Sequence, residues 1–178
     1  MAVKDVLIYP DPLLKEVCEP IKVFDESAGR LLQDLVDTMV DAGHSVGVAA
    51  PQIGDLRRAV VVDVSTSKLG KKQKNHGLIC MVNPEILERE GHTVVREGCM
   101  SVPEYTGNVS RAERIVVQFI NREGQHQVIR SEDFEAIAIQ HELDHLDGKL
   151  FLDRVSSLKT DLFRRKKLSL WRIFLKNA

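Results

Sequence analysis

The pattern of apolar and polar positions along the chain predicts two helices. Apolar residues recur at helical spacing through residues 31–40, and Gly43 follows where a glycine commonly ends a helix. A second helix is predicted over residues 131–147, with Ser131 as its N-cap and Gly148 just beyond its end. Apolar side chains occupy two faces of this second helix, which leaves little of its surface to face water. We therefore expect the second helix to run through the core.

Short runs rich in β-branched residues predict strands between the two helices. Glycine, asparagine, proline or charged residues separate these runs. The polar, basic stretch at 68–77 is predicted to be an exposed loop, and residues 121–124 a hairpin loop. The expected strands are residues 59–64, 78–82, 93–95, 115–120 and 127–129.

This order of elements predicts an α+β fold, with antiparallel β-sheets packed around a buried central helix at 131–147. The chain has 178 residues, a length that one hydrophobic core can serve, so we expect residues 1–178 to form a single domain. Hydrophobic residues make up 43% and charged residues 29%, which is ordinary globular composition and argues against disorder.

Positive charge is concentrated at the C-terminus. The net charge is −1, yet from Arg154 onward eight Lys or Arg residues face a single acid, Asp161. Leucines and aromatic residues accompany these bases, which predicts a basic C-terminal helix or tail from about 156 to 178. Such a segment suits RNA phosphates, whereas a solvated helix face and attachment to a membrane surface are the alternatives.

The N-terminus reaches the polar residues 9–12 too early for a signal peptide, and nowhere do about 18 apolar residues run together. We therefore expect a cytoplasmic protein that has no membrane partner. The chain has three cysteines, and an odd number in a cytosolic protein favours free thiols or metal ligands over disulfides.

The second predicted helix carries two histidines spaced to bind one metal ion. His141 and His145 are four residues apart and so share a helix face, with Glu142 beside them. A divalent ion lowers the pKa of water from about 16 toward about 7, and a neighbouring carboxylate can accept the proton. The alternative is two core histidines at this spacing by chance, but burial of two rings is unfavourable unless their polar atoms are satisfied.

A catalytic ion needs a third protein ligand, and the sequence places it upstream. No glutamate follows His145, and Phe151 stands where an extended zinc-protease pattern would have a further histidine. Cys80 lies within an apolar run and is interpreted as a small core side chain of a buried strand, whereas no motif surrounds Cys18. Cys99 lies between a glycine and a proline, as expected where a strand end delivers a ligand, although alone it would also suit a buried free thiol. A thiolate with two imidazoles favours zinc or iron(II).

Three segments together resemble the signature motifs of bacterial-type peptide deformylases. They are Gly-Val-Ala-Ala-Pro-Gln at 47–52, Glu-Gly-Cys-Met-Ser at 97–101 and Gln-His-Glu-Leu-Asp-His at 140–145, and the resemblance extends over about residues 9–159. It implies a metal-dependent hydrolase that removes the formyl group from the N-terminal formylmethionine of newly made proteins and releases formate. It also implies one divalent ion per chain, iron(II) in the cell, with zinc, nickel or cobalt able to occupy the site.

The resemblance assigns roles to individual residues. Cys99, His141 and His145 would bind the metal ion, with Glu142 as the general acid and base. The Gln52 side chain and the backbone N–H of Met100 would stabilise the oxyanion, and Gly47 belongs to the same catalytic set. The methionine pocket would be formed by Val46, Val95, Phe134, Ile137 and Ala138.

Some positions depart from the family pattern. Ser45 replaces a usual glycine, Met100 replaces a usual leucine, and Tyr105–Thr106 stand where some members carry a substrate-binding arginine. The resemblance therefore does not indicate which residues are preferred after the methionine. We also expect an ion pair between Glu97 and Arg111 to support the cysteine segment.

Two other functions share part of the pattern. An ordinary metalloprotease would use the two histidines but needs a downstream ligand, and a non-catalytic metal module would need a fourth ligand such as Cys18 or Cys80. Neither accounts for Gln52 together with Cys99. The expected partners are formylmethionine-bearing nascent chains and, through the basic C-terminus, the ribosome.

Overall fold

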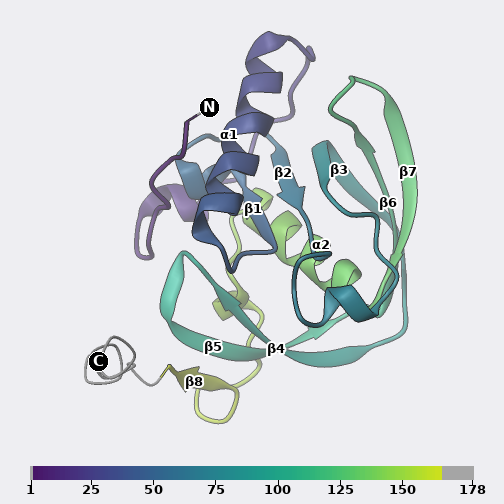
Figure 1. Ribbon diagram of the computed structural model, residues 1–178. Coiled ribbons are helices and arrows are strands. Elements are labelled where there is room, and N and C mark those ends of the chain that lie inside the picture. Colours follow the sequence, from purple (N-terminus) through teal and green to yellow (C-terminus); the bar gives the residue numbers. More distant parts are fainter. Residues whose placement is uncertain (1, 166–178) are drawn as a thin grey trace, which may run out of the picture.

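The computed structural model describes residues 2–165, which form two α-helices and two antiparallel sheets (Figure 1). The helices are α1 (Glu26–Ala42) and α2 (Asp133–Leu146). The larger sheet has the order β1-β2-β3-β6-β7, made of β1 (Gly47–Ala49), β2 (Ala59–Val62), β3 (Ile79–Glu90), β6 (Arg114–Ile120) and β7 (His126–Glu132). The smaller sheet has the order β4-β5-β8, made of β4 (Thr93–Cys99), β5 (Val102–Arg111) and β8 (Leu162–Arg164). The predicted α+β class is confirmed.

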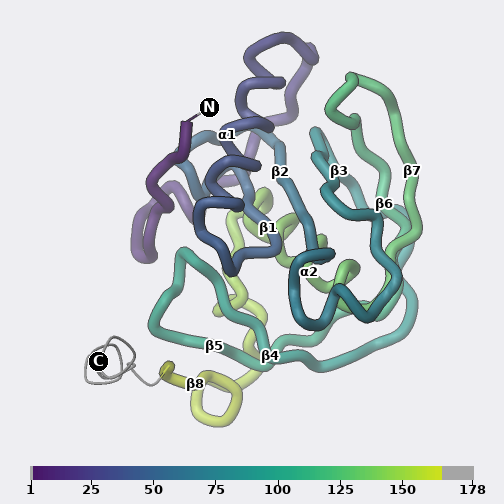
Figure 2. The backbone as a smooth tube through the Cα atoms, viewed as in Figure 1, coloured from purple at the N-terminus to yellow at the C-terminus, as the bar shows by residue number. Residues whose placement is uncertain are grey.

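The two helices cover opposite faces of β2. Val60 and Val62 pack into the same cluster as the apolar residues of α2, whereas Ala59 and Val61 pack with α1. Successive strand residues point to opposite faces, so β2 is buried on both sides, as its unbroken run of apolar residues requires. Figure 2 traces the chain from β3 in the larger sheet through β4 and β5 in the smaller one, below α2. The prediction of a buried helix is confirmed.

The helix ends were predicted with mixed success. Gly43 ends α1 with φ of 67°, a left-handed conformation that glycine adopts without strain. Ser131, however, does not cap α2, because β7 continues pairing with β6 as far as Glu132. The Ser131 hydroxyl instead donates to Glu135 Oε2 at 2.8 Å, one turn into the helix. The predicted N-cap is therefore wrong.

Every predicted strand is present, and β1, β5 and β8 are additional. β1 and β8 have three residues each and β5 contains Pro103 and Gly107, so none shows a clear apolar alternation. The C-terminal helix predicted from about 156 is wrong for the described residues, because Leu162–Arg164 pairs with β5 as β8. The rest of the predicted tail, residues 166–178, lies outside the described residues. Within residues 2–165, no helix has the length and apolar character needed to cross a bilayer.

Candidate active site

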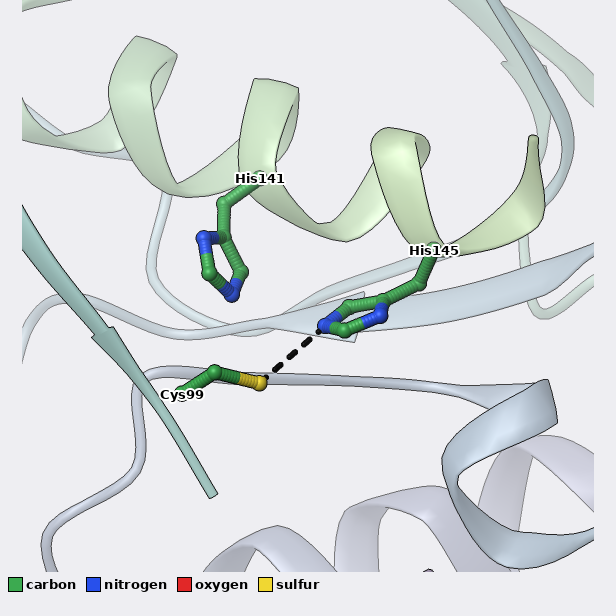
Figure 3. Close-up of side chains that lie close together, drawn as sticks. All are labelled: Cys99, His141 and His145. Carbon is green, nitrogen blue, oxygen red and sulfur yellow. Dashed lines mark hydrogen bonds between the residues drawn. The ribbon is translucent and has the colours of Figure 1, made fainter. Parts of the chain in front are cut away.

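α2 and the end of β4 bring together the three predicted metal ligands (Figure 3). The ligand atoms of Cys99, His141 and His145 all lie within 4.8 Å of one another, and Cys99 Sγ is 3.3 Å from His145 Nε2. Cys18 and Cys80 are buried elsewhere and take no part in this cluster. Of the three cysteines, Cys99 is therefore the one that the fold places beside the two histidines.

The donor chemistry of the cluster fits a divalent cation. Burial would raise the pKa of the Cys99 thiol, but the charge on His145 and hydrogen bonds with both histidines hold it well below its usual value. His141 Nδ1 is 2.8 Å from Glu97 Oε2, which leaves Nε2 of the same ring for a metal ion. One thiolate and two imidazoles form a three-ligand site suited to zinc or iron(II).

A chain of charges lies behind the histidines, buried from Glu97 to Asp144 and ending at the exposed Arg154. Arg111 donates to both carboxylate oxygens of Glu97, at 2.7 and 2.9 Å, and to Asp144 Oδ2 at 2.6 Å. Arg154 donates to both oxygens of the same Asp144, at 3.0 and 2.6 Å. Burial would raise the pKa of Glu97, but hydrogen bonds from Arg111 and His141 lower it to about 2. The predicted Glu97–Arg111 pair is confirmed, and it orients His141.

Glu142 lies against Gly47 in the wall of the cavity. Burial raises the pKa of Glu142 to about 7, and its Oε2 atom is buried without a hydrogen-bond partner in the described residues. A Cβ atom on residue 47 would lie 2.6 Å from Glu142 Oε1, so this approach requires a glycine. The Ser45 hydroxyl donates to the carbonyl of Gly47 at 2.7 Å, which fixes the start of β1.

Gln52 is held with its amide group directed at the cysteine. It lies in the short 3-10 helix Ala50–Ile53, which follows β1 directly. Its Oε1 accepts the N–H of Ala49 at 2.9 Å, so Nε2 points toward Ser101 Oγ at 3.2 Å and Cys99 Sγ at 3.5 Å. Met100, in the turn after β4, lines the same cavity.

The cluster opens into a cavity of about 920 Å³. Apolar side chains of α2, together with Val95 of β4, form one part of its wall, as a pocket for an apolar side chain requires. All five residues predicted for the methionine pocket line this cavity: Val46, Val95, Phe134, Ile137 and Ala138. The loop at 68–77 also contributes Leu69 and Gln73.

Sequence reasoning missed two groups of charged residues near the site. Asp144 and Arg154 complete the charge chain. A charged residue on a helix predicted to be buried needs a partner, and that signal could have identified Asp144. Arg96 and Arg165 also line the cavity, although nothing in their sequence context indicated it.

Known proteins resemble this chain over most of its length. The family model for polypeptide deformylase matches residues 3–161. A peptide deformylase of Alkalilimnicola ehrlichii is 44% identical over 166 residues, which cover 93% of this chain and 89% of the relative. The crystal structure of a peptide deformylase from Legionella pneumophila superposes with a TM-score of 0.78 at 42% identity and covers 89% of each chain. A Met-Ala-Ser-bound class I type b peptide deformylase from Acinetobacter baumannii superposes with a TM-score of 0.80 at 31% identity, covering 86% of this chain and 99% of that one. The chain therefore belongs to the polypeptide deformylase family.

Proposed function

We propose that the protein removes the formyl group from N-terminal formylmethionine and releases formate. The observation that carries this proposal is the buried Glu142 carboxylate, whose Oε2 atom has no hydrogen-bond partner among the described residues, at the wall of the cavity beside the Cys99, His141 and His145 cluster. A bound divalent cation would polarise the formyl carbonyl and acidify a water molecule. Membership of the family supports iron(II) as the native ion, with zinc, nickel or cobalt able to replace it.

The residues around the cluster supply proton transfer and hydrogen bonds. Glu142 accepts a proton from the attacking water through its carboxylate and passes it to the leaving amine nitrogen. A pKa of about 7 lets this carboxyl group both accept and release a proton near neutral pH. Gln52 Nε2 and the backbone N–H of Met100 donate to the formyl oxygen as negative charge develops on it.

The substrate is proposed to bind as an extended peptide along β4. This strand is at the edge of its sheet, and five consecutive residues, 95–99, line the cavity. A free strand edge offers backbone donors and acceptors to an added strand. The methionine side chain then enters the pocket formed by Val95, Phe134 and Ile137. The Met-Ala-Ser bound to the Acinetobacter baumannii relative supports a site that accepts a peptide beginning with methionine.

The first test is formate release from a formyl-Met-Ala-Ser peptide by protein purified without oxygen and supplied with iron(II) or nickel(II). We expect turnover with the formylated peptide and none with free Met-Ala-Ser. Removal of the ion by a chelator should abolish formate release, and its return should restore it. Cleavage of the Met–Ala bond in the unformylated peptide would instead indicate an ordinary metalloprotease.

Gly47→Ala should lower turnover by about 10- to 100-fold with little change in metal content. The added Cβ would displace the Glu142 carboxylate, and a misplacement of about 1 Å can have an effect of this size. Gly29→Ala, in α1, is the matched control, because a Cβ there meets nothing within 4 Å. Unchanged kcat in Gly47→Ala would show that the close approach to Glu142 is not needed.

The location and partners follow from this activity as proposals. Formylated chains emerge from the ribosome, so we place the enzyme in the cytoplasm, with residues 1–178 acting as one catalytic domain. The basic C-terminal residues are proposed to contact ribosomal RNA phosphates. Most of that segment, residues 166–178, lies outside the described residues.

A further inference from the structure

The last described residues place a guanidinium group at the substrate cleft. The backbone N–H of Arg165 donates to the carbonyl of Glu104 at 2.7 Å, directly after β8. The Arg165 guanidinium lies against Gly98, and a Cβ atom on residue 98 would collide with it. Gly98 immediately precedes the metal ligand Cys99. A cation is therefore held one residue from the metal cluster.

A second guanidinium lies on the same face of β4. Arg96 and Gly98 are two residues apart on this strand and so point to one side of it. The Arg96 guanidinium is stacked 3.5 Å from the centroid of the Phe163 ring, which β8 supplies. Both arginines are exposed and line the cavity, and within residues 2–165 neither side chain forms an ion pair. Two neighbouring cations without a counter-ion favour an anionic ligand.

The alternation of an extended peptide predicts which substrate residue meets these cations. The methionine side chain must point inward, toward the face of β4 that carries Val95, Glu97 and Cys99. The side chain of the next residue then points to the opposite face, where Arg96 and Gly98 lie. Each extended residue advances by about 3.3 Å, so the second residue lies level with this part of β4.

We propose that Arg165, together with Arg96, makes the enzyme prefer formylated chains with Asp or Glu directly after the methionine. This inference rests on the proposed function, because it requires the peptide to lie along β4. The acidic side chain forms an ion pair with the Arg165 guanidinium over Gly98. β8 thus serves as a specificity element that positions Arg165 and, through Phe163, Arg96.

The test compares three peptides, formyl-Met-Glu-Ser, formyl-Met-Gln-Ser and formyl-Met-Lys-Ser, by kcat/KM at low salt. For the wild-type protein we expect the Glu peptide to exceed the isosteric Gln peptide by about fivefold, the size of a partly exposed ion pair. The Lys peptide should fall below both. Added salt should reduce the Glu-to-Gln ratio, since exposed charges are screened.

Arg165→Gln should bring the Glu-to-Gln ratio close to one, and Arg96→Gln should lower it in part. Arg164→Gln is the matched control: it removes the same charge from the neighbouring residue, whose side chain faces Glu104 at 3.5 Å. This variant should keep the wild-type ratio. An equal fall in Arg164→Gln and Arg165→Gln would overturn the proposal in favour of general surface charge.

The peptide series also separates this inference from the proposed function. Turnover of all three peptides with equal kcat/KM would overturn the preference and leave the deformylase activity established. Absence of formate from every peptide, with fully metallated and folded protein, would overturn both.

Discussion

Glu142→Gln should bind its metal ion normally and lose about 10²- to 10⁴-fold of its turnover, the usual contribution of a general acid–base group. Glutamine has nearly the same shape as glutamate, so it fits beside Gly47 and leaves the Cys99, His141 and His145 cluster intact. It cannot accept a proton from water or return one to the leaving amine. The measurement pairs formate release with the metal content of the same preparation.

Glu135→Gln provides a control on the same helix. Glu135 is also a buried carboxylate of α2, but it accepts hydrogen bonds from Ser131 and from the backbone N–H of His76, and it does not line the cavity. Metal-loaded Glu135→Gln should retain most of the wild-type turnover. Near-normal activity in fully metallated Glu142→Gln would remove Glu142 from proton transfer, and loss of the metal would show that it supports the ligands instead.

Sequence patterns predicted α2 and its metal ligands well because both depend on short-range spacing. Two histidines at i and i+4 share a helix face whatever the rest of the fold does. The third ligand, Cys99, was harder to predict from the sequence. Its approach to α2 depends on tertiary structure, including a register shift between Gly98 and Cys99 in the β4–β5 pair. The elimination of downstream ligands left it as the best candidate, and the resemblance agreed.

The elements that sequence analysis missed depend on long-range pairing. β8 lies within the basic, partly amphipathic segment from about 156 that was predicted to be helical, but Phe163 pairs with Thr106 of β5 and stacks on Arg96 of β4. Tertiary contacts of this kind override local propensity. The false N-cap at Ser131 has a similar cause, since pairing with β6 holds that residue in a strand.

The charge chain was predicted only at its first link, the pair of Glu97 and Arg111. Glu97 lies two residues before Cys99, and Arg111 was expected to pair with it in support of the cysteine segment. Asp144 and Arg154 join from α2 and from the segment after it, and no local pattern connects them to Arg111. This chain runs from Arg154 through to the ring of His141, so its loss should affect both folding and the metal site.

Arg111→Met should lower the free energy of unfolding by about 3–5 kcal/mol, the usual effect of removing one partner from a buried ion pair. Methionine keeps much of the arginine stem but leaves Glu97 and Asp144 buried without their shared cation. Glu97 would also lose the contact that aims it at His141 Nδ1, so metal affinity should fall by about 10- to 100-fold. Urea unfolding of the metal-free protein and titration with zinc measure the two effects separately.

Arg114→Met is the matched control, because Arg114 pairs with Glu90 on an exposed face of the larger sheet. Solvent screens that pair, so its loss should change stability far less and leave metal affinity unaltered. An equal loss of unfolding free energy in Arg111→Met and Arg114→Met would mean that water reaches the charge chain. Unchanged metal affinity in Arg111→Met would mean that another contact orients His141.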